Sequence, residues 1–439
     1  MDLTLSNVVF PREVEAATSK SIAHRMLICA AFSNLPSRFK FRRAGDDIFR
    51  TLDCLMALGA RVEKLRSDGT VLEFLLHPAK DIPSEAILDC GESGSTLRFL
   101  LPLAAALGVH AVYQRRGRLA ERPLSSLEEL LVAAGVNVWT DDEGRLHTEG
   151  KLCPGHFELP GHISSQFISG MIFAMSVMDG VSTLRITSRV ESAPYIRMTL
   201  GVIRNYGVKF SYADAEIRVE GAGQTGLRRP RNYQAEGDWS GAAAFLCAGD
   251  VGGHPVKVTG LKLRTLQGDR KVLNILREFG ARVYREDDQS VTVGPGRLHG
   301  IVIDARDIPD LIPVLCCVAA AASGVTLIRH AERLKLKESD RLGGIYQILS
   351  AFGVPVRMTE DGMQISGGTD LHGANVSSFH DHRMAMAVSV MASMLDPDKT
   401  VHLTDAECVT KSWPGYWEDL GVIPSGNASA DGMAEGALL

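Results

Sequence analysis

The chain has 439 residues, of which 45% are hydrophobic and 23% are charged, and its formal net charge is -5. This length exceeds the size at which single hydrophobic cores stop growing, so it predicts a globular protein of two domains. The negative net charge argues against a surface that coats nucleic acid, but it leaves room for a local basic pocket and a small anionic ligand.

The first predicted helix raises a question of charge. The stretch A-T-S-K-S-I-A-H-R-M (17–26) leads into the apolar run M-L-I-C-A-A-F (26–32), so Lys20 and Arg25 lie where a helix begins. A helix N-terminus already carries free N–H groups and about half an elementary positive charge, which disfavours cations there. We therefore expect a negative group at this end of the helix.

A helix, a glycine and a short alternating strand then recur along the chain at intervals of about 70 residues. Glycine suits the left-handed position that ends a helix, and the alternation after it is typical of a strand. The pattern is least clear in its last copy, E-D-L-G-V-I-P. The six glycines are Gly59, Gly135, Gly207, Gly280, Gly353 and Gly421. Six copies of one unit are predicted.

A second series runs in parallel with the glycines and consists of polar clusters, each of which opens an apolar, Ala-rich helix. Its markers are Lys20, Gly94, Ser165, Ser240, Asp310 and Asp381. Helices this apolar are buried on most sides, so we expect them to fill the domains while amphipathic helices cover sheets outside. In symmetric units the polar N-termini of such helices converge.

Six units divide most simply into two domains of three, with a boundary near R-R-P-R-N-Y-Q-A-E-G-D (228–238). The longest weakly polar run, 312–328, is interrupted by Pro and Gly, which favours a buried helix running into a strand over a membrane span. The Gly/Ala/Ser-rich tail from 425 is predicted to be disordered. No leader is indicated at the N-terminus, and the eight cysteines form no C-x-x-C pair, so we expect buried thiols in a cytoplasmic protein.

The polar clusters alone have two interpretations. Ser, Asp and Gly are favoured helix caps worth about 1 kcal/mol each, and a cap needs no ligand. The cations favour a ligand, because Arg and Lys beside buried helix N-termini are tolerated when phosphate or carboxylate neutralises both. The cations in or next to the clusters are Lys20, Arg25, Arg98, Arg122, Lys337, Arg341, Arg383 and Lys411. A ligand with more than one anionic group is predicted.

Two acids and two histidines remain open to more than one interpretation. Asp310 and Glu338 are either partners of neighbouring cations or carboxylates that remain ionised at neutral pH and accept a proton from a hydroxyl group. His380 and His382 raise the possibility of a metal site, but the sequence places no third ligand nearby, which favours a structural or phosphate-adjacent role. No P-loop is found, and G-P-G-R-L-H-G (294–300) matches the dinucleotide fingerprint poorly.

The ordered motifs together resemble the 5-enolpyruvylshikimate-3-phosphate (EPSP) synthase family from about residue 17 to 420. They are S-K-S-I-x-x-R, G-x-S-G-S-T-x-R, E-R-P, S-S-Q-F, G-D-W-S, D-I-P-D, L-K-x-K-E-S-D-R, D-H-R-M-A-M and C-V-T-K-S-W-P. The resemblance implies an α/β fold of two inside-out domains, each with three βαβαββ units around buried parallel helices, that close over the substrates. The expected first domain spans 19–235, and the expected second domain combines 1–18 with 236–424.

The resemblance also implies transfer of an enolpyruvyl group from phosphoenolpyruvate to shikimate 3-phosphate, by a monomer that needs no metal or other cofactor and binds neither nucleic acid nor membrane. The implied catalytic residues are Lys20, Asp310, Glu338 and Lys411. The implied contacts to shikimate 3-phosphate are Lys20, Ser21, Arg25, Ser164, Ser165, Gln166, Ser192, Tyr195, Asp310 and Lys337. Those to phosphoenolpyruvate are Lys20, Gly94, Arg122, Gln166, Glu338, Arg341, Arg383 and Lys411.

Three positions depart from the family pattern. Glu92 stands where an amide is common, Phe99 where proline is common, and Arg333 where a small amide is expected. Two other functions stay open at this point. One is the related UDP-N-acetylglucosamine enolpyruvyl transferase, although the loop at 116–123 lacks the reactive cysteine of that branch. The other is a non-catalytic sugar-phosphate-binding protein.

Overall fold

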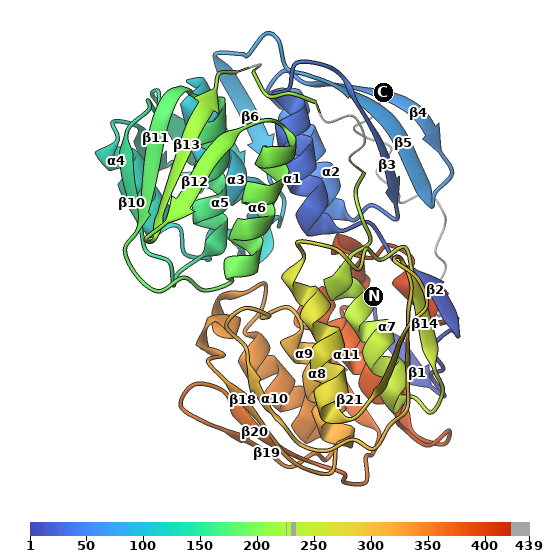
Figure 1. The fold of residues 1–439 in the computed structure, drawn as a ribbon. Helices are drawn as coiled ribbons and strands as arrows, with labels where there is room; N and C mark the ends of the chain where they lie inside the picture. The colour runs from blue at the N-terminus through green and yellow to red at the C-terminus, as the bar shows by residue number, and fades with distance from the viewer. Residues whose placement is uncertain (225, 230–233, 423–439) are drawn as a thin grey trace. The chain divides into compact units, whose positions relative to one another are not determined.

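The computed structural model describes residues 1–224, 226–229 and 234–422, so the predicted disordered tail lies outside the described residues. The chain divides into two compact units (Figure 1). Among the described residues, unit 1 contains Met1–Ser19 and 236–422, and unit 2 contains the described part of 20–235. Each unit has its own continuous hydrophobic core.

The repeat predicted from the glycine series is a βαβαββ unit with a sheet of its own. In the second repeat of unit 2, β6 (Glu85–Asp89) and β7 (His110–Gln114) are parallel, and the hairpin of β8 (Asn137–Thr140) and β9 (Leu146–Glu149) adds antiparallel in the order β6-β7-β9-β8. Two further sheets repeat this order, β10-β11-β13-β12 and β17-β18-β20-β19. The predicted α/β class and the repeated units are confirmed.

The other three sheets vary this plan: β3-β5-β4 and β1-β22-β21 have three strands, and β15-β16-β14-β2 has four. The remaining strands of unit 2 are β3 (Ser37–Arg42), β4 (Arg61–Ser67), β5 (Val71–His77), β10 (His156–Leu159), β11 (Asp179–Ile186), β12 (Lys209–Ala213) and β13 (Glu216–Ala222). The strands of unit 1 are β1 (Leu3–Ser6), β2 (Glu13–Glu15), β14 (Val256–Thr259), β15 (Arg282–Arg285), β16 (Val291–Gly294), β17 (Val302–Asp304), β18 (Gly324–Arg329), β19 (Val356–Met358), β20 (Met363–Gly367), β21 (Ala374–Ser377) and β22 (Thr400–Thr404).

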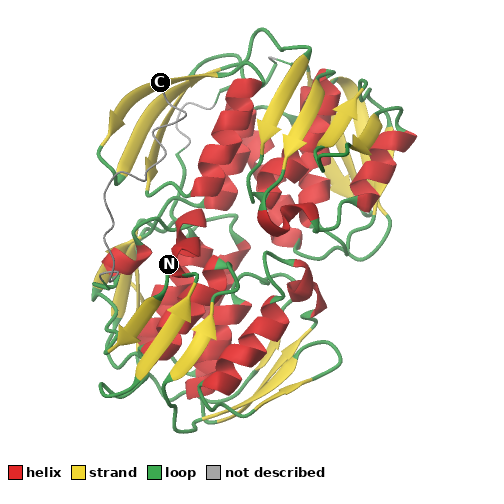
Figure 2. Cartoon of the chain, turned by 180° about the vertical axis from the view of Figure 1, so that it is seen from behind, coloured by secondary structure: helices red, strands yellow, loops and turns green. Residues whose placement is uncertain are grey.

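Six apolar helices are buried along nearly their whole length and begin at or just after the polar clusters. They are α1 (Lys20–Ala31), α3 (Gly94–Leu107), α5 (Ser165–Val177), α7 (Trp239–Val251), α9 (Ile312–Ala321) and α11 (His382–Ala392). Because they are apolar on all sides, they pack against one another inside each unit, as α7, α9 and α11 do. Figure 2 shows the sheets around the outside of each unit, with most of the helices on their inner side.

The second set of helices ends at the glycine series. It comprises α2 (Asp46–Ala57), α4 (Ser125–Ala133), α6 (Ala193–Asn205), α8 (Val272–Phe279), α10 (Arg341–Ala351) and α12 (Tyr416–Asp419). All six glycines after them have positive φ, from 67° at Gly421 to 112° at Gly280. That conformation is costly for residues with a Cβ atom, so glycine follows each helix, and after the first five of these glycines the chain enters a strand.

The N-terminal segment completes two sheets of unit 1. β1 pairs antiparallel with β22, with Leu5 opposite Val401. β2 pairs parallel with β14, with Val14 opposite Val258. The first and last repeats of unit 1 therefore each contain a strand from the N-terminal segment.

Four short 3₁₀ helices connect these elements: η1 (Gly117–Ala120), η2 (Gly268–Lys271), η3 (Glu332–Leu336) and η4 (Ala406–Lys411). Within the described part of the chain, no helix has both the length and the apolar character needed to cross a membrane. The run at 312–328 forms α9 and the start of β18, as predicted.

Candidate functional site

Lys20 is the first residue of α1, and the chain itself supplies an acid beside it. Its Nζ atom lies 2.8 Å from Oδ2 of Asp47, which stands in the first turn of α2. Both side chains are largely buried, with exposed fractions of 13% and 11%. The negative group expected at this helix end therefore includes Asp47, which the sequence interpretation missed although D-D opens an amphipathic helix.

Arg25 lies about one turn further along α1 and donates hydrogen bonds to several residues, two of which the sequence had singled out. Its Nη1 atom donates to Ser21 O at 2.6 Å, and Nη2 donates to Tyr195 O at 3.3 Å. Nε donates to Oγ1 of Thr199 at 2.8 Å. The guanidinium carbon stands 4.9 Å from the ring centroid of Phe99, a favourable cation–π arrangement. Phe99, where proline is common, thus supports the Arg25 guanidinium.

Two guanidinium groups converge on the N-terminus of α3. A Cβ atom on Gly94 would lie 2.6 Å from Nη1 of both Arg98 and Arg122, so a side chain here would displace the two guanidinium groups. Burial, with the charge of Arg122, lowers the pKa of Arg98. Two like charges side by side at a positive helix end make this position favourable for an anion.

Gln166 links α5 to the same place. It accepts from Arg98 Nη1 at 3.3 Å through Oε1, and its Nε2 donates to Ser95 Oγ at 3.0 Å. Ser164 caps α5, because its Oγ accepts the N–H of Gln166 at 3.2 Å. The cap interpretation therefore applies to Ser164, and Ser165 lies buried directly after it. Ser192 precedes α6 in the left-handed conformation, with φ of 56°.

Glu92 lies against the loop that carries Arg122. A Cβ atom on Gly117 would come within 2.8 Å of Glu92 Cδ, so the Glu92 side chain covers this glycine at the start of η1. The backbone N–H of Arg116 donates to Gly91 O at 2.8 Å in the same place. The acid that departs from the family pattern thus packs on the beginning of the Arg122 loop.

In unit 1, Arg341 is the centre of a buried charge cluster. Its Nη1 atom lies 2.7 Å from Asp310 Oδ1, and its Nε lies 2.7 Å from Asp381 Oδ2. Glu338 Oε1 is 4.0 Å from Nη2. Burial alone lowers the pKa of Arg341, but these carboxylates outweigh burial and raise it.

Asp310 remains ionised in this cluster. Burial raises the pKa of Asp310, but the charges of Arg341 and Lys337, followed by Arg383, outweigh burial and hold it well below its usual value. The same balance of burial against Arg341 lowers the pKa of Asp381. Both acids therefore carry negative charge at neutral pH.

Arg383, in the first turn of α11, is buried with unfilled donors. Its Nη2 atom donates to Ser240 Oγ at 2.5 Å. Nε and Nη1 have no hydrogen-bond partner among the described residues, and the residue is 3% exposed. A buried guanidinium with two donors unmatched is costly unless an acceptor arrives, so these donors point to an anionic ligand.

Third ligands do lie near both histidines, contrary to the sequence-based expectation. Glu338, Asp381 and His382 form one group and His380, Asp405 and Glu407 another, each with its ligand atoms within 4.8 Å. In the first group His382 Nδ1 is 2.9 Å from Glu338 Oε2, and Arg341 already neutralises Asp381. In the first group these partners give the acids a structural account, and in the second Glu407 pairs with the N-terminal amine.

Three more residues singled out in the sequence lie in unit 1. Lys411 ends η4, and its Nζ donates to His380 O at 2.8 Å. Arg333 lies within η3 and Lys337 directly follows it, and both are half-buried. His382, for which the sequence favoured a structural or phosphate-adjacent role, lies beside Glu338. Thr199 was missed by the sequence interpretation, because nothing local marks it.

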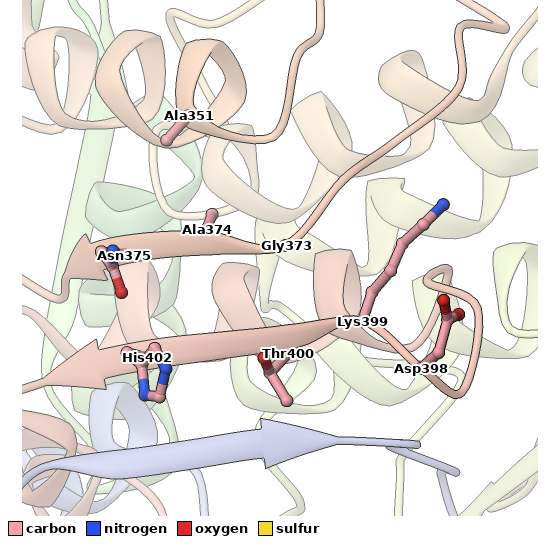
Figure 3. A pocket seen from close by; sticks show the side chains of 8 residues that line it. All are labelled: Ala351, Gly373, Ala374, Asn375, Asp398, Lys399, Thr400 and His402. Atoms are coloured by element: carbon pink, nitrogen blue, oxygen red, sulfur yellow. The ribbon is translucent and has the colours of Figure 1, made fainter.

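A shallow pocket in unit 1 lies apart from these residues. It is lined by residues of β21 and β22 and the turn before β22 (Figure 3): Ala351, Gly373, Ala374, Asn375, Asp398, Lys399, Thr400 and His402. Lys399 in its lining already donates to Leu371 O at 2.9 Å. None of the predicted site residues lines this pocket.

Comparison with known proteins gives the same family along nearly the whole chain. Residues 10–420 match the profile of EPSP synthase (3-phosphoshikimate 1-carboxyvinyltransferase). A 3-phosphoshikimate 1-carboxyvinyltransferase from Clostridium acetobutylicum is 36% identical over 413 residues, which cover 93% of this chain and 94% of the relative. One from Clostridioides difficile is 36% identical over 419 residues, 94% of each chain.

Solved structures show the same fold. The structure of EPSP synthase from Acinetobacter baumannii superposes with a TM-score of 0.77 at 24% identity, covering 96% of this chain and 97% of that one. An enolpyruvyl transferase from Streptomyces tendae gives a TM-score of 0.73 at 19% identity, with 96% and 97% coverage.

Proposed function

Because the chain belongs to the EPSP synthase (3-phosphoshikimate 1-carboxyvinyltransferase) family, we propose that it transfers the enolpyruvyl group of phosphoenolpyruvate to the 5-hydroxyl of shikimate 3-phosphate. Phosphate is released, and the product lies on the route to chorismate and the aromatic amino acids. The observation that carries the proposal is the buried, incompletely bonded Arg383. Such a donor set matches a ligand with carboxylate or phosphate oxygens.

We assign shikimate 3-phosphate mainly to the domain of residues 19–235, and the donor mainly to the domain formed by 1–18 and 236–424. Arg25, held from both sides by Thr199 and Phe99, is oriented to bind a phosphate group. The proposed contacts to shikimate 3-phosphate are Lys20, Ser21, Arg25, Ser164, Ser165, Gln166, Ser192, Tyr195, Asp310 and Lys337.

The donor is proposed to be held by cations on helix N-termini. Gly94 lets the Arg98 and Arg122 guanidinium groups come close to the N-terminus of α3, where both could donate to an anionic group. Arg383 has donors to spare for a carboxylate or a phosphate. The proposed contacts to phosphoenolpyruvate are Lys20, Gly94, Arg122, Gln166, Glu338, Arg341, Arg383 and Lys411.

Asp310 is proposed to accept the proton of the 5-hydroxyl as that oxygen bonds to C2 of phosphoenolpyruvate. In the unliganded protein Arg341 lowers the basicity of Asp310 by pairing with it at 2.7 Å. A bound anion that shares the charge of Arg341 and Arg383 would make Asp310 a stronger base.

The methylene carbon of the donor gains a proton during the addition and loses one during the elimination of phosphate. We propose Glu338, together with Lys20, for these transfers. Lys411 would assist the departing phosphate by neutralising its charge. Holding two polyanions together also lowers the entropic part of the barrier, which is potentially worth several kcal/mol.

We further propose that the protein acts as a monomer in the cytoplasm. All eight cysteines are free and seven are buried, which fits a reducing compartment. The proposed partners are limited to the two small anionic substrates.

The test is phosphate release by the purified protein mixed with phosphoenolpyruvate and shikimate 3-phosphate. We expect turnover with this acceptor and none with UDP-N-acetylglucosamine. Asp310→Asn and Lys20→Met should each reduce kcat by at least about 100-fold, the usual contribution of a positioned acid or base. Turnover with the UDP-sugar alone would place the protein in the related branch, and binding without phosphate release would make it a non-catalytic relative.

A further inference from the structure

The chain passes from unit 1 to unit 2 after Ser19 and returns at Glu236. On the unit 1 side, the backbones of these two crossing segments are hydrogen-bonded to each other. The N–H of Ser19 donates to Glu236 O at 2.8 Å, and an antiparallel bridge joins Thr18 to Gly237. The two crossings therefore begin as one two-stranded element.

One buried side chain, Gln267, is bonded to both strands of this element. Its Oε1 atom accepts from Ser19 Oγ at 2.9 Å and from the N–H of Trp239 at 3.2 Å. Its Nε2 atom donates to Gly237 O at 2.9 Å. Gln267 is 5% exposed, so water does not replace these bonds readily.

The residues next to these anchors lead directly to the proposed site. Ser19 precedes Lys20, whose ammonium group pairs with Asp47. Trp239 precedes Ser240, whose hydroxyl accepts from Arg383 at 2.5 Å. A shift of either strand would thus move a group assigned to the substrates.

We propose that Gln267 is a positioning residue that sets the place of Lys20 through Ser19 and of Arg383 through Trp239 and Ser240. The inference rests on the function proposed above. In this role Gln267 acts through the backbone and not by touching a substrate. It acts by fixing the backbone at both crossings at once.

Only an amide of this length supplies the required bonds. A single planar group must accept two hydrogen bonds on one side and donate one on the other. Methionine has a similar length but provides neither. An ionised glutamate accepts both bonds but would face the carbonyl oxygen of Gly237 without a proton to donate.

The first experiment compares Gln267→Met with Gln364→Met, the same replacement at a half-buried position of β20. We expect Gln267→Met to lower kcat about tenfold or more per folded molecule, since small misplacements of catalytic groups are costly. Gln364→Met should leave kcat within about twofold. An unchanged kcat in Gln267→Met would overturn the proposal.

Hydrogen exchange measured without any substrate separates this inference from the proposed reaction. Gln267→Met should speed exchange in peptides that contain Ser19 and Gly237, and Gln364→Met should not. Unchanged exchange at both crossings would overturn the anchoring role whatever reaction the protein catalyses. Failure of the wild type to release phosphate would instead overturn the proposed function.

Two milder variants serve if Gln267→Met fails to fold. Ser19→Ala removes one of the three bonds and should lower kcat in the same direction by less. Gln267→Glu regains a donor when its carboxyl group is protonated, so its kcat relative to wild type should rise as the pH falls. Glu236 and Lys262 lie beside this position, so the midpoint of the change in the ratio belongs to the new carboxyl group together with that of Glu236. A ratio that does not change with pH would contradict the need for a donor toward Gly237.

Discussion

Among single residues, Arg25 shows how neutral neighbours orient a buried cation that we propose binds a phosphate group. Thr199 accepts from its Nε, and Phe99 carries its guanidinium plane. Thr199 in turn donates to Ser169 Oγ at 2.8 Å, so its orientation is itself fixed. The direction of the cation is set before any ligand binds.

Replacing Thr199 should therefore weaken binding of the phosphorylated acceptor. Thr199→Val keeps the shape but leaves Nε of Arg25 without its acceptor inside the protein. We expect the KM for shikimate 3-phosphate to rise about tenfold, matching the roughly 1.5 kcal/mol of a charge-assisted hydrogen bond. Steady-state kinetics with Thr148→Val as a control, a buried threonine bonded to Tyr113, would check this. Equal effects of the two variants would contradict the role of Thr199.

Asp250 is a buried acid near the end of α7 and is only 4% exposed. Burial raises the pKa of Asp250 to about 7, although a backbone hydrogen bond from Gly296 lowers it in part. The unfolded chain loses this proton near pH 4 and the native state near pH 7, so the free energy of unfolding falls across that interval.

Asp250→Asn removes this titration. The difference in melting temperature between Asp250→Asn and wild type should grow from pH 5 to pH 8. Over that interval the variant should gain about 2 kcal/mol in the free energy of unfolding relative to wild type. Thermal unfolding at several pH values measures it, and exposed Asp398→Asn should show no such trend. A difference between Asp250→Asn and wild type that does not change with pH would refute the argument.

At the scale of elements, the glycines after the amphipathic helices differ in how tightly they are enclosed. A Cβ atom on Gly59 would lie 2.5 Å from the carbonyl oxygen of Asp81. At Gly135 no atom of the described residues lies within 4 Å of the added carbon. Both have positive φ, 99° and 86°. Alanine at either position would adopt an unfavourable backbone conformation, but only at Gly59 would its Cβ atom also clash with another residue.

Gly135→Ala should destabilise unit 2 by about 1 kcal/mol, the cost of a left-handed alanine. Gly59→Ala should cost about 2 kcal/mol more, because the carbonyl of Asp81 must move as well. Urea unfolding of the two variants side by side gives the difference. Similar costs would mean that the turn at Gly59 relaxes freely.

The elements themselves were largely predictable from the sequence, and their contacts were not. The clusters of Ser, Asp and Gly marked where α3 and α5 begin, because capping is a local property. Asp47 beside Lys20 depends on how α2 packs on α1, which no local pattern reveals. Glu338 and His382 come from separate motifs, and their contact was missed for the same reason.

At the scale of the whole molecule, the N-terminal strands connect the two ends of the chain within unit 1. The repeat count foretold six units, but only the family resemblance placed the first residues with the second domain. A sequence pattern shows that a strand exists, and not which sheet it joins, because that depends on pairing across almost the full chain.

A mutation in β1 should therefore affect one unit only. Leu5→Ala, at a position 1% exposed, should destabilise unit 1 by about 2–5 kcal/mol. Leu76→Ala in β5, at 0% exposure, is the matched change in unit 2. Hydrogen exchange resolved by peptide should accelerate in unit 1 for the first variant and in unit 2 for the second. Acceleration in unit 2 on replacing Leu5 would show that the units do not unfold independently.

The pairing of β1 with β22 also sets an order of events during synthesis. Leu5 leaves the ribosome first, but its partner Val401 is made almost 400 residues later, after roughly 20–80 s at ordinary translation rates. All of unit 2 is complete before then. The first strand must therefore wait, unpaired, while the middle of the chain folds ahead of both its ends. During that time the backbone N–H and C=O groups of β1 are free to pair with another chain, which a chaperone on the nascent chain would prevent.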